Sequence, residues 1–111
     1  GIFSGDRELA GSFAGASVKT GERVWELPID DERLRKKIRS EMADIVNSGG
    51  RYGGAITAAM FLREFVGEGI KWLHMDIAGV DSSDEDFGYY IKGATGFGVR
   101  TCLEWLEKIG K

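Results

Sequence analysis

Apolar residues recur every three or four positions in two stretches of the chain, the spacing of one face of a helix. This pattern predicts helices over residues 6–19 and 99–108. The side chains of Ser4 and Asp6 can accept hydrogen bonds from the free amides at the start of the first. Residues 54–66 are small or apolar almost throughout, so we expect a third helix there that is buried nearly all round. The apolar positions of the first and last of these helices are Leu9, Phe13, Ala16, Val99, Cys102, Leu103, Leu106 and Ile109.

A fourth helix is predicted over residues 32–46. The acidic run Asp30-Asp31-Glu32 suits the positive end of a helix dipole, and Asn47-Ser48-Gly49-Gly50 would end the helix. The basic residues between Arg33 and Arg39 then form its solvated face rather than a binding patch. Its apolar stripe would be Leu34, Ile38, Met42 and Ile45.

Two further segments have the pattern of strands. Apolar and other residues alternate over 23–29, where Pro28 favours an edge or a strand end. Residues 71–77 are short and mostly apolar, as in an interior strand. Residues 78–98 are glycine-rich without a sustained period, so we expect mostly loop. The sequence therefore predicts one α/β domain over residues 1–111, with helices packed on a small, mostly parallel sheet.

Composition narrows the class of protein. The chain has 111 residues, 42% of them hydrophobic, which is enough for one modest domain. A net charge of −3 disfavours nucleic acid as a partner, and no apolar run approaches the roughly 18 residues of a membrane span. Cys102 is the single cysteine, so an internal disulfide is impossible and a reducing, intracellular compartment is expected. The chain opens with Gly1 instead of methionine, from which we expect that the sequence starts inside a longer protein.

Few residues have a spacing that points to catalysis. His74 is the only histidine, so a two-histidine zinc site cannot form, and on an apolar strand we expect a packed side chain with Asp76 on the same face. No Gly-x-Ser-x-Gly motif is present. The acidic run 81–86 lacks the EF-hand spacing, and the glycines of 93–98 are in the reverse order of a dinucleotide fingerprint.

The glycine-rich segment 49–54 has two interpretations. Four glycines around Arg51 at the start of a helix would let backbone amides approach a ligand or another chain closely. The same glycines would also allow a buried helix to pack closely behind the loop. Spacing alone leaves both open.

Several stretches, in order along the chain, resemble the leucyl aminopeptidases, the two-metal cytosol aminopeptidase family. They are GIFSGD at 1–6, GERVWELP at 21–28, NSGGRYGGAITAAMFL at 47–62, WLHMDIAG at 72–79 and GATGFGVRT at 93–101. Any one of these pieces would be weak evidence. Their shared order covers nearly the whole chain and makes the resemblance specific.

The resemblance implies a reaction and its cofactors. The family removes amino-terminal residues from peptides with two divalent metal ions, zinc or manganese, which activate a bridging water. Its metal ligands include an Asn-Thr-Asp-Ala-Glu-Gly-Arg segment that this chain lacks and that lies upstream of the part resembled here. We therefore expect no catalytic residue and no metal ligand in the chain. Its partners would be peptide substrates and the upstream part of the same enzyme. The full-length protein would be a cytoplasmic homo-hexamer.

The resemblance also implies three substrate-binding residues. In the family, the alanine of the Asp-Ile-Ala-Gly stretch and the residue three further on line the pocket for the substrate's amino-terminal side chain. These positions are Ala78 and Asp81 here. Asp81 is a departure, because some relatives have an apolar residue there. Ser48, just before a Gly-Gly pair, corresponds to a contact for the second substrate residue.

An alternative belongs to another class of protein: a free-standing interaction module that has kept the fold and lost the chemistry. An Asn-Thr-Asp-Ala-Glu-Gly-Arg segment encoded upstream would favour the enzyme, and an initiator methionine just before Gly1 would favour the module.

Overall fold

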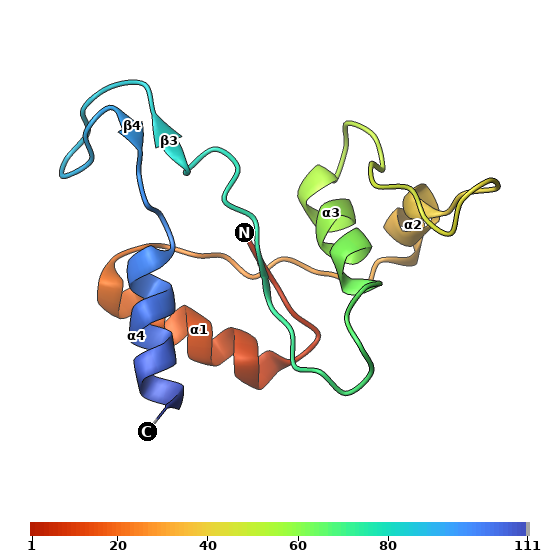
Figure 1. Cartoon of the computed structure of the whole chain (residues 1–111), viewed down its shortest axis with the longest axis horizontal. Coiled ribbons are helices and arrows are strands. Elements are labelled where there is room, and N and C mark those ends of the chain that lie inside the picture. Colours follow the sequence, from red (N-terminus) through yellow and green to blue (C-terminus); the bar gives the residue numbers. More distant parts are fainter. Residues whose placement is uncertain (111) are drawn as a thin grey trace. The chain divides into compact units, whose positions relative to one another are not determined.

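The computed structural model describes residues 1–110, which divide into two compact units (Figure 1). Unit 1 comprises Gly1–Ala10 and Trp25–Asp76, and unit 2 comprises Gly11–Val24 and Ile77 onward. Helix α1 (Arg7–Thr20) begins in unit 1 and continues into unit 2. Among the described residues, no helix is both long enough and apolar enough to cross a membrane.

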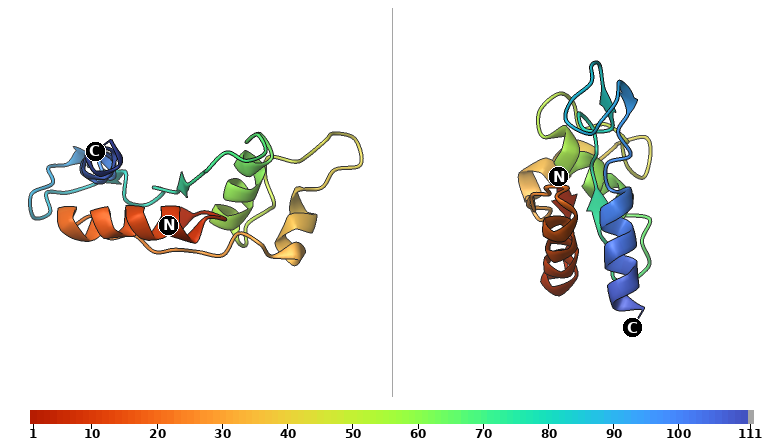
Figure 2. Two further views of the ribbon diagram at one scale, coloured as in Figure 1. Left: turned by 90° about the horizontal axis from the view of Figure 1, so that it is seen from below. Right: turned by 90° about the vertical axis from the view of Figure 1, so that its left-hand side faces the viewer.

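Unit 1 is a small α/β layer. Strand β1 (Ile2–Phe3) pairs antiparallel with β2 (His74–Met75), with Ile2 opposite Met75. Helix α2 (Glu32–Arg35) runs into a 3-10 turn, η1 (Lys36–Ile38), and α3 (Gly54–Arg63) lies beside them (Figure 2). The buried core of this unit consists of Phe3, Ile29, Ile38, Ala59 and Met60.

Unit 2 joins the second part of α1 to α4 (Val99–Ile109) and to a short hairpin, β3 (Ser82–Ser83) and β4 (Gly93–Ala94). The buried Phe13 ring meets the edge of Trp105, with ring centroids 5.7 Å apart. Lys19 Nζ also lies 2.7 Å from Glu104 Oε1. These contacts join the two helices, which run in different directions (Figure 1).

Three predicted helices are confirmed. The Asp6 side chain accepts a hydrogen bond from the Leu9 N–H at 3.0 Å and caps α1, as its position predicts. Helix α3 ends three residues earlier than expected, and α4 ends within one residue of expectation. Helix α3 is also the least exposed of the three, because only Gly54 and Leu62 are exposed in it, although Leu62 at 44% leaves it less enclosed than predicted.

The predicted helix over 32–46 is wrong beyond Ile38. Arg39 is extended, and the Ser40 hydroxyl accepts the N–H groups of Met42 and Ala43 at 3.2 and 2.9 Å. A serine side chain that bonds nearby backbone in this way competes with the helical pattern. Met42, expected in the buried stripe, is 99% exposed. The basic residues between Arg33 and Arg39 are exposed, as predicted.

The α/β class is confirmed, but the strands are shorter than predicted, two residues each, and differently paired. Both strand pairs are antiparallel, and the one parallel contact is a single bridge between Ile2 and Glu26. Segment 23–29 therefore contributes one bridge instead of a strand, and Trp25 is 76% exposed. Alternation identifies extended segments, but the direction of pairing depends on which distant segments meet.

Ala59 provides a test of the packing around α3. Its side chain is fully buried in the core of unit 1, so Ala59→Leu should overpack it and lower the free energy of unfolding by about 1–3 kcal/mol. Ala58→Leu, one position along and only partly buried, is the matched control and should cost less. Chemical denaturation measures the free energy of unfolding of both variants. Equal costs would mean that the full burial of Ala59 does not determine the effect of added volume.

Candidate functional site

Ala78 and Asp81 lie in unit 2, in the loop that leads from β2 to β3. Both are exposed. The chain turns here at Gly79, whose φ of +85° lies in the left-handed region, and the Val80 N–H donates to the Ile77 carbonyl at 3.0 Å. The turn presents Ala78 and Asp81 at the surface of the unit, which suits residues that line an open pocket.

Thr95 fixes the backbone of this loop. Its N–H donates to the Asp81 carbonyl at 2.9 Å, and its hydroxyl donates to the Val80 carbonyl at 2.5 Å. Thr95 immediately follows β4, and β4 pairs with β3 directly after Asp81. The position of the Asp81 backbone therefore depends on residues 93–95.

A cavity of about 590 Å³ lies between the hairpin and the turn at Gly21. Its wall is mostly apolar and includes the aromatic residues Phe87, Tyr89 and Phe97. Val80 also lines it, whereas Ala78 and Asp81 do not. Ala78 and Asp81 thus lie beside this cavity and not in it.

Glu22 is a buried carboxylate at the start of α4. Its side chain is 1% exposed, and it accepts the N–H and the hydroxyl of Thr101 at 3.0 and 2.6 Å. Burial alone would raise the pKa of Glu22, but these hydrogen bonds, with further ones from Gly98 and Arg100, hold it below its ordinary value. Gly98 stands at the N-cap without a side chain, so Glu22 supplies the missing acceptor from elsewhere in the sequence.

Ser48 lies in unit 1 and is exposed. Its neighbour Gly49 packs against α3, because a Cβ there would meet Thr57 Cγ2 at 2.8 Å. Gly53 is similarly close to Leu34, at 3.2 Å for a Cβ. These contacts favour close helix packing as the reason for both glycines.

His74 is packed, as predicted. Its ring stacks on Trp72 with an interplanar angle of 8° and lies 5.8 Å from the Phe3 ring. Burial lowers the pKa of His74, and the Asp76 carboxylate opposes that effect. Within residues 1–110, no three histidine, cysteine or acidic side chains form a group that could hold a metal ion. The described residues therefore do not fit a metal site.

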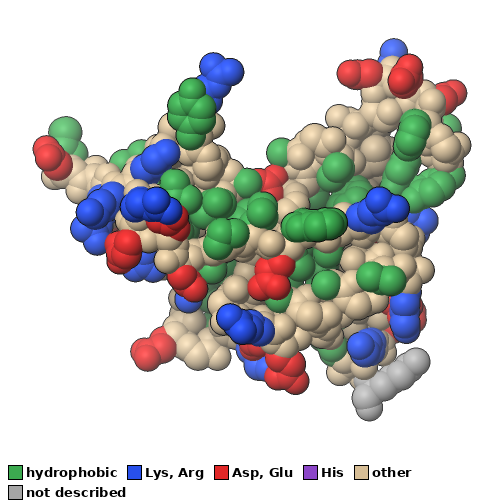
Figure 3. Space-filling model, turned by 180° about the vertical axis from the view of Figure 1, so that it is seen from behind, with side chains coloured by type: hydrophobic (Ala, Val, Ile, Leu, Met, Phe, Trp, Pro, Cys, Tyr) green, Lys and Arg blue, Asp and Glu red, His purple; other side chains and the backbone are tan. Residues whose placement is uncertain are grey.

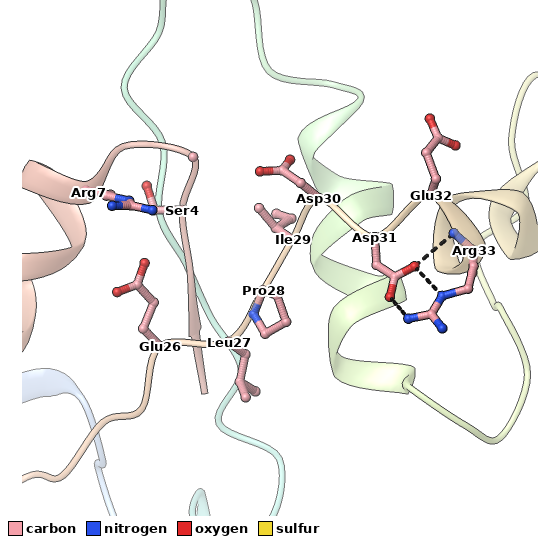
Figure 4. A pocket seen from close by; sticks show the side chains of 11 residues that line it. Ser4, Arg7, Glu26, Leu27, Pro28, Ile29, Asp30, Asp31, Glu32 and Arg33 are labelled. Atoms are coloured by element: carbon pink, nitrogen blue, oxygen red, sulfur yellow. Dashed lines mark hydrogen bonds and ion pairs between the residues drawn. The ribbon is translucent and has the colours of Figure 1, made fainter.

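A second hollow, of about 740 Å³, lies in unit 1 (Figure 4). Two of its acidic residues already have partners. Asp31 caps α2 by accepting the Arg33 N–H at 2.9 Å, and Asp30 pairs with Arg63 at 3.0 Å. These pairings give the acids a structural role, and we assign no ligand to this hollow.

Comparison with known proteins matches residues 1–103 to the cytosol aminopeptidase family, catalytic domain. The chain is 64% identical over 109 residues to the probable cytosol aminopeptidase of Aquifex aeolicus (strain VF5). The chain belongs to the cytosol aminopeptidase family. It is also 47% identical over 108 residues to the chloroplastic neutral leucine aminopeptidase of Solanum lycopersicum, so the resemblance seen in the sequence is confirmed.

Solved structures agree with this family. Bottromycin maturation enzyme BotP in complex with Mn is similar to the chain with a TM-score of 0.93 and 38% identity, over 99% of this chain and 24% of that one. A mutant of tomato leucine aminopeptidase gives a TM-score of 0.85 with 40% identity, over 96% of this chain and 20% of that one. The fold is therefore that of a piece of these enzymes.

The chain spans about a fifth of the length of its relatives. The match to the Aquifex aeolicus aminopeptidase covers 98% of this chain and 22% of that protein, and the match to the tomato enzyme covers 97% and 18%. Most of a cytosol aminopeptidase thus lies outside the residues described here.

The structure places Ala78 and Asp81 on one loop and Ser48 in the other unit. Sequence reasoning missed Glu22, Thr95, Tyr89 and Arg100, the residues that hold the loop and its hairpin. One signal was available: the predicted helix at 99–108 has no Ser, Thr, Asp or Asn at its start, so its first amides need an acceptor from elsewhere.

Proposed function

We propose that this chain is the carboxy-terminal part of the catalytic domain of a two-metal leucyl aminopeptidase, and that it supplies substrate-pocket wall and core. One observation carries the proposal: a family model of the catalytic domain matches residues 1–103, while a relative at 64% identity is matched over only 22% of its length. The substrates are peptides, from which the intact enzyme removes amino-terminal residues.

The metal ions belong to the upstream part of the enzyme in this proposal. The described residues contain no group of side chains fit to hold one, and the BotP structure that resembles the chain is a complex with Mn. We therefore propose two ions, zinc or manganese, bound outside this segment. In this proposal Ser48, Ala78 and Asp81 contact the substrate and none of them binds a metal ion.

Exposed apolar side chains favour the presence of a partner that covers them in the intact protein. Val18 and Met42 are 81% and 99% exposed, and further large apolar residues lie at the surface in both units (Figure 3). Large apolar side chains that are exposed in such number favour a surface that is covered in the intact protein. We propose that the upstream part of the same enzyme covers it, and that the intact protein is a cytoplasmic homo-hexamer.

Asp81 tests the pocket assignment. A carboxylate at the rim should attract a substrate with lysine or arginine at its amino terminus and disfavour leucine. Asp81→Met in the intact enzyme should therefore raise the ratio of leucine to arginine kcat/KM by about tenfold, which corresponds to roughly 1.4 kcal/mol of transition-state discrimination.

Asp84→Met is the matched control, because Asp84 is an exposed acid three residues further on, just after β3, that the pocket assignment does not include. It should leave the ratio unchanged. If Asp81→Met altered turnover of both substrates by the same factor, Asp81 would not determine specificity.

A further inference from the structure

The hairpin that begins at Asp81 has little to stabilise it by itself. Its two strands, β3 and β4, are two residues long, and an isolated two-stranded hairpin is marginal in water. Gly88 and Gly93, within it, have φ values of +59° and +119°, conformations that glycine alone adopts readily. The position of the Ala78–Asp81 loop therefore needs support from other elements.

One support is at the base of the hairpin. Thr95 holds the Val80 and Asp81 carbonyls and lies three residues before Gly98, the N-cap of α4. Glu22 accepts hydrogen bonds from Thr101 in the first turn of that helix. The buried Glu22 carboxylate thus fixes the start of α4. Thr95, just before this helix, connects it to the loop through its hydrogen bonds to the Val80 and Asp81 carbonyls.

The other support is near the tip. Arg100, in the first turn of α4, donates from Nη2 to the Tyr89 hydroxyl at 2.6 Å, and its guanidinium carbon lies 4.8 Å from the Tyr89 ring centroid. Arg100 Nε also lies 3.4 Å from Glu22 Oε1. Base and tip of the hairpin are therefore both held by the N-terminal turn of one helix.

We propose that Glu22, Arg100 and Tyr89 are positioning residues that set where the Ala78–Asp81 wall lies, and so determine how well the enzyme accepts a large amino-terminal side chain. This inference rests on the proposed function. None of the three contacts substrate in this scheme. They act through the hairpin and through Thr95.

Tyr89→Phe in the intact enzyme is the test, because it removes one hydroxyl and keeps the ring. The substrates are leucyl and glycyl p-nitroanilide, since glycine has no side chain to meet the wall. We expect leucyl kcat/KM to fall about fivefold, mainly through KM, while glycyl kcat/KM changes by less than about twofold. A general loss of folded enzyme would lower both equally, through kcat.

Tyr52→Phe is the matched control, since Tyr52 is an exposed tyrosine of unit 1, 77% exposed against 66% for Tyr89. It should change kcat/KM for neither substrate. If Tyr89→Phe left the leucyl-to-glycyl ratio as in the wild type, the positioning role would be overturned while the proposed function stood. If the intact wild type hydrolysed neither substrate with manganese or zinc, the proposed function would fail and the inference with it.

Discussion

Replacing Glu22 by alanine should lower the free energy of unfolding by about 2–4 kcal/mol. The substitution removes the acceptor for the Thr101 N–H and hydroxyl, and Thr101 is itself fully buried. The N–H would lose the partner that it has away from water, while the hydroxyl would keep only the Thr20 hydroxyl at 2.8 Å. It also removes the negative charge at the N-terminus of α4. Glu26→Ala, an exposed glutamate four residues on, is the matched control and should cost no more than about 0.5 kcal/mol.

The same carboxylate predicts a pH dependence. Hydrogen bonds hold the folded-state pKa of Glu22 below its ordinary value of 4.5. A lowered folded-state pKa stabilises the protein above the unfolded-state pKa, and this contribution is lost as pH falls through the folded-state pKa. Chemical denaturation should therefore show the stability advantage of wild type over Glu22→Gln shrinking as pH falls below 4.5.

Two results would contradict this account of Glu22. One is a cost for Glu22→Ala no larger than that for Glu26→Ala. The other is a constant difference between wild type and Glu22→Gln from neutral pH to about pH 3, since an uncoupled carboxylate would give no proton linkage.

Local patterns in the sequence predicted the helices well. Helices α1, α3 and α4 follow from apolar spacing and from the Asp6 cap, which are properties of neighbouring residues. The predicted helix over 32–46 failed because Ser40 offers the backbone an alternative partner, which apolar spacing does not register. The predicted parallel direction of strand pairing was wrong because the partner of β1 lies some seventy residues away, in β2.

The candidate substrate residues could be proposed only through the family. The resemblance gave Ala78, Asp81 and Ser48, and no spacing in the chain would have chosen them. Glu22 was missed because its partners, Thr101 and Arg100, lie nearly eighty residues further along the chain. Nothing near position 22 distinguishes a buried carboxylate from the exposed ones around it.

The chain alone should hydrolyse no aminoacyl amide, even with added zinc or manganese. Residues 1–110 contain no cluster of side chains that could hold a metal ion, and the family's Asn-Thr-Asp-Ala-Glu-Gly-Arg segment does not occur in the sequence. In the proposed enzyme, metal ions would activate the attacking water and stabilise the developing oxyanion, and this chain has no group of residues to hold them. The expected effect is complete loss of turnover relative to the intact enzyme.

The most direct test of the central claim compares two purified proteins, the chain of residues 1–111 and the intact protein that carries it. Each is assayed on leucyl p-nitroanilide before and after manganese or zinc is added, with circular dichroism to confirm that the helices of the chain form. We expect metal-dependent turnover by the intact protein and none by the chain. Metal-dependent turnover by the chain that survives removal of contaminating peptidase would contradict it, as would an intact protein inactive with both metals.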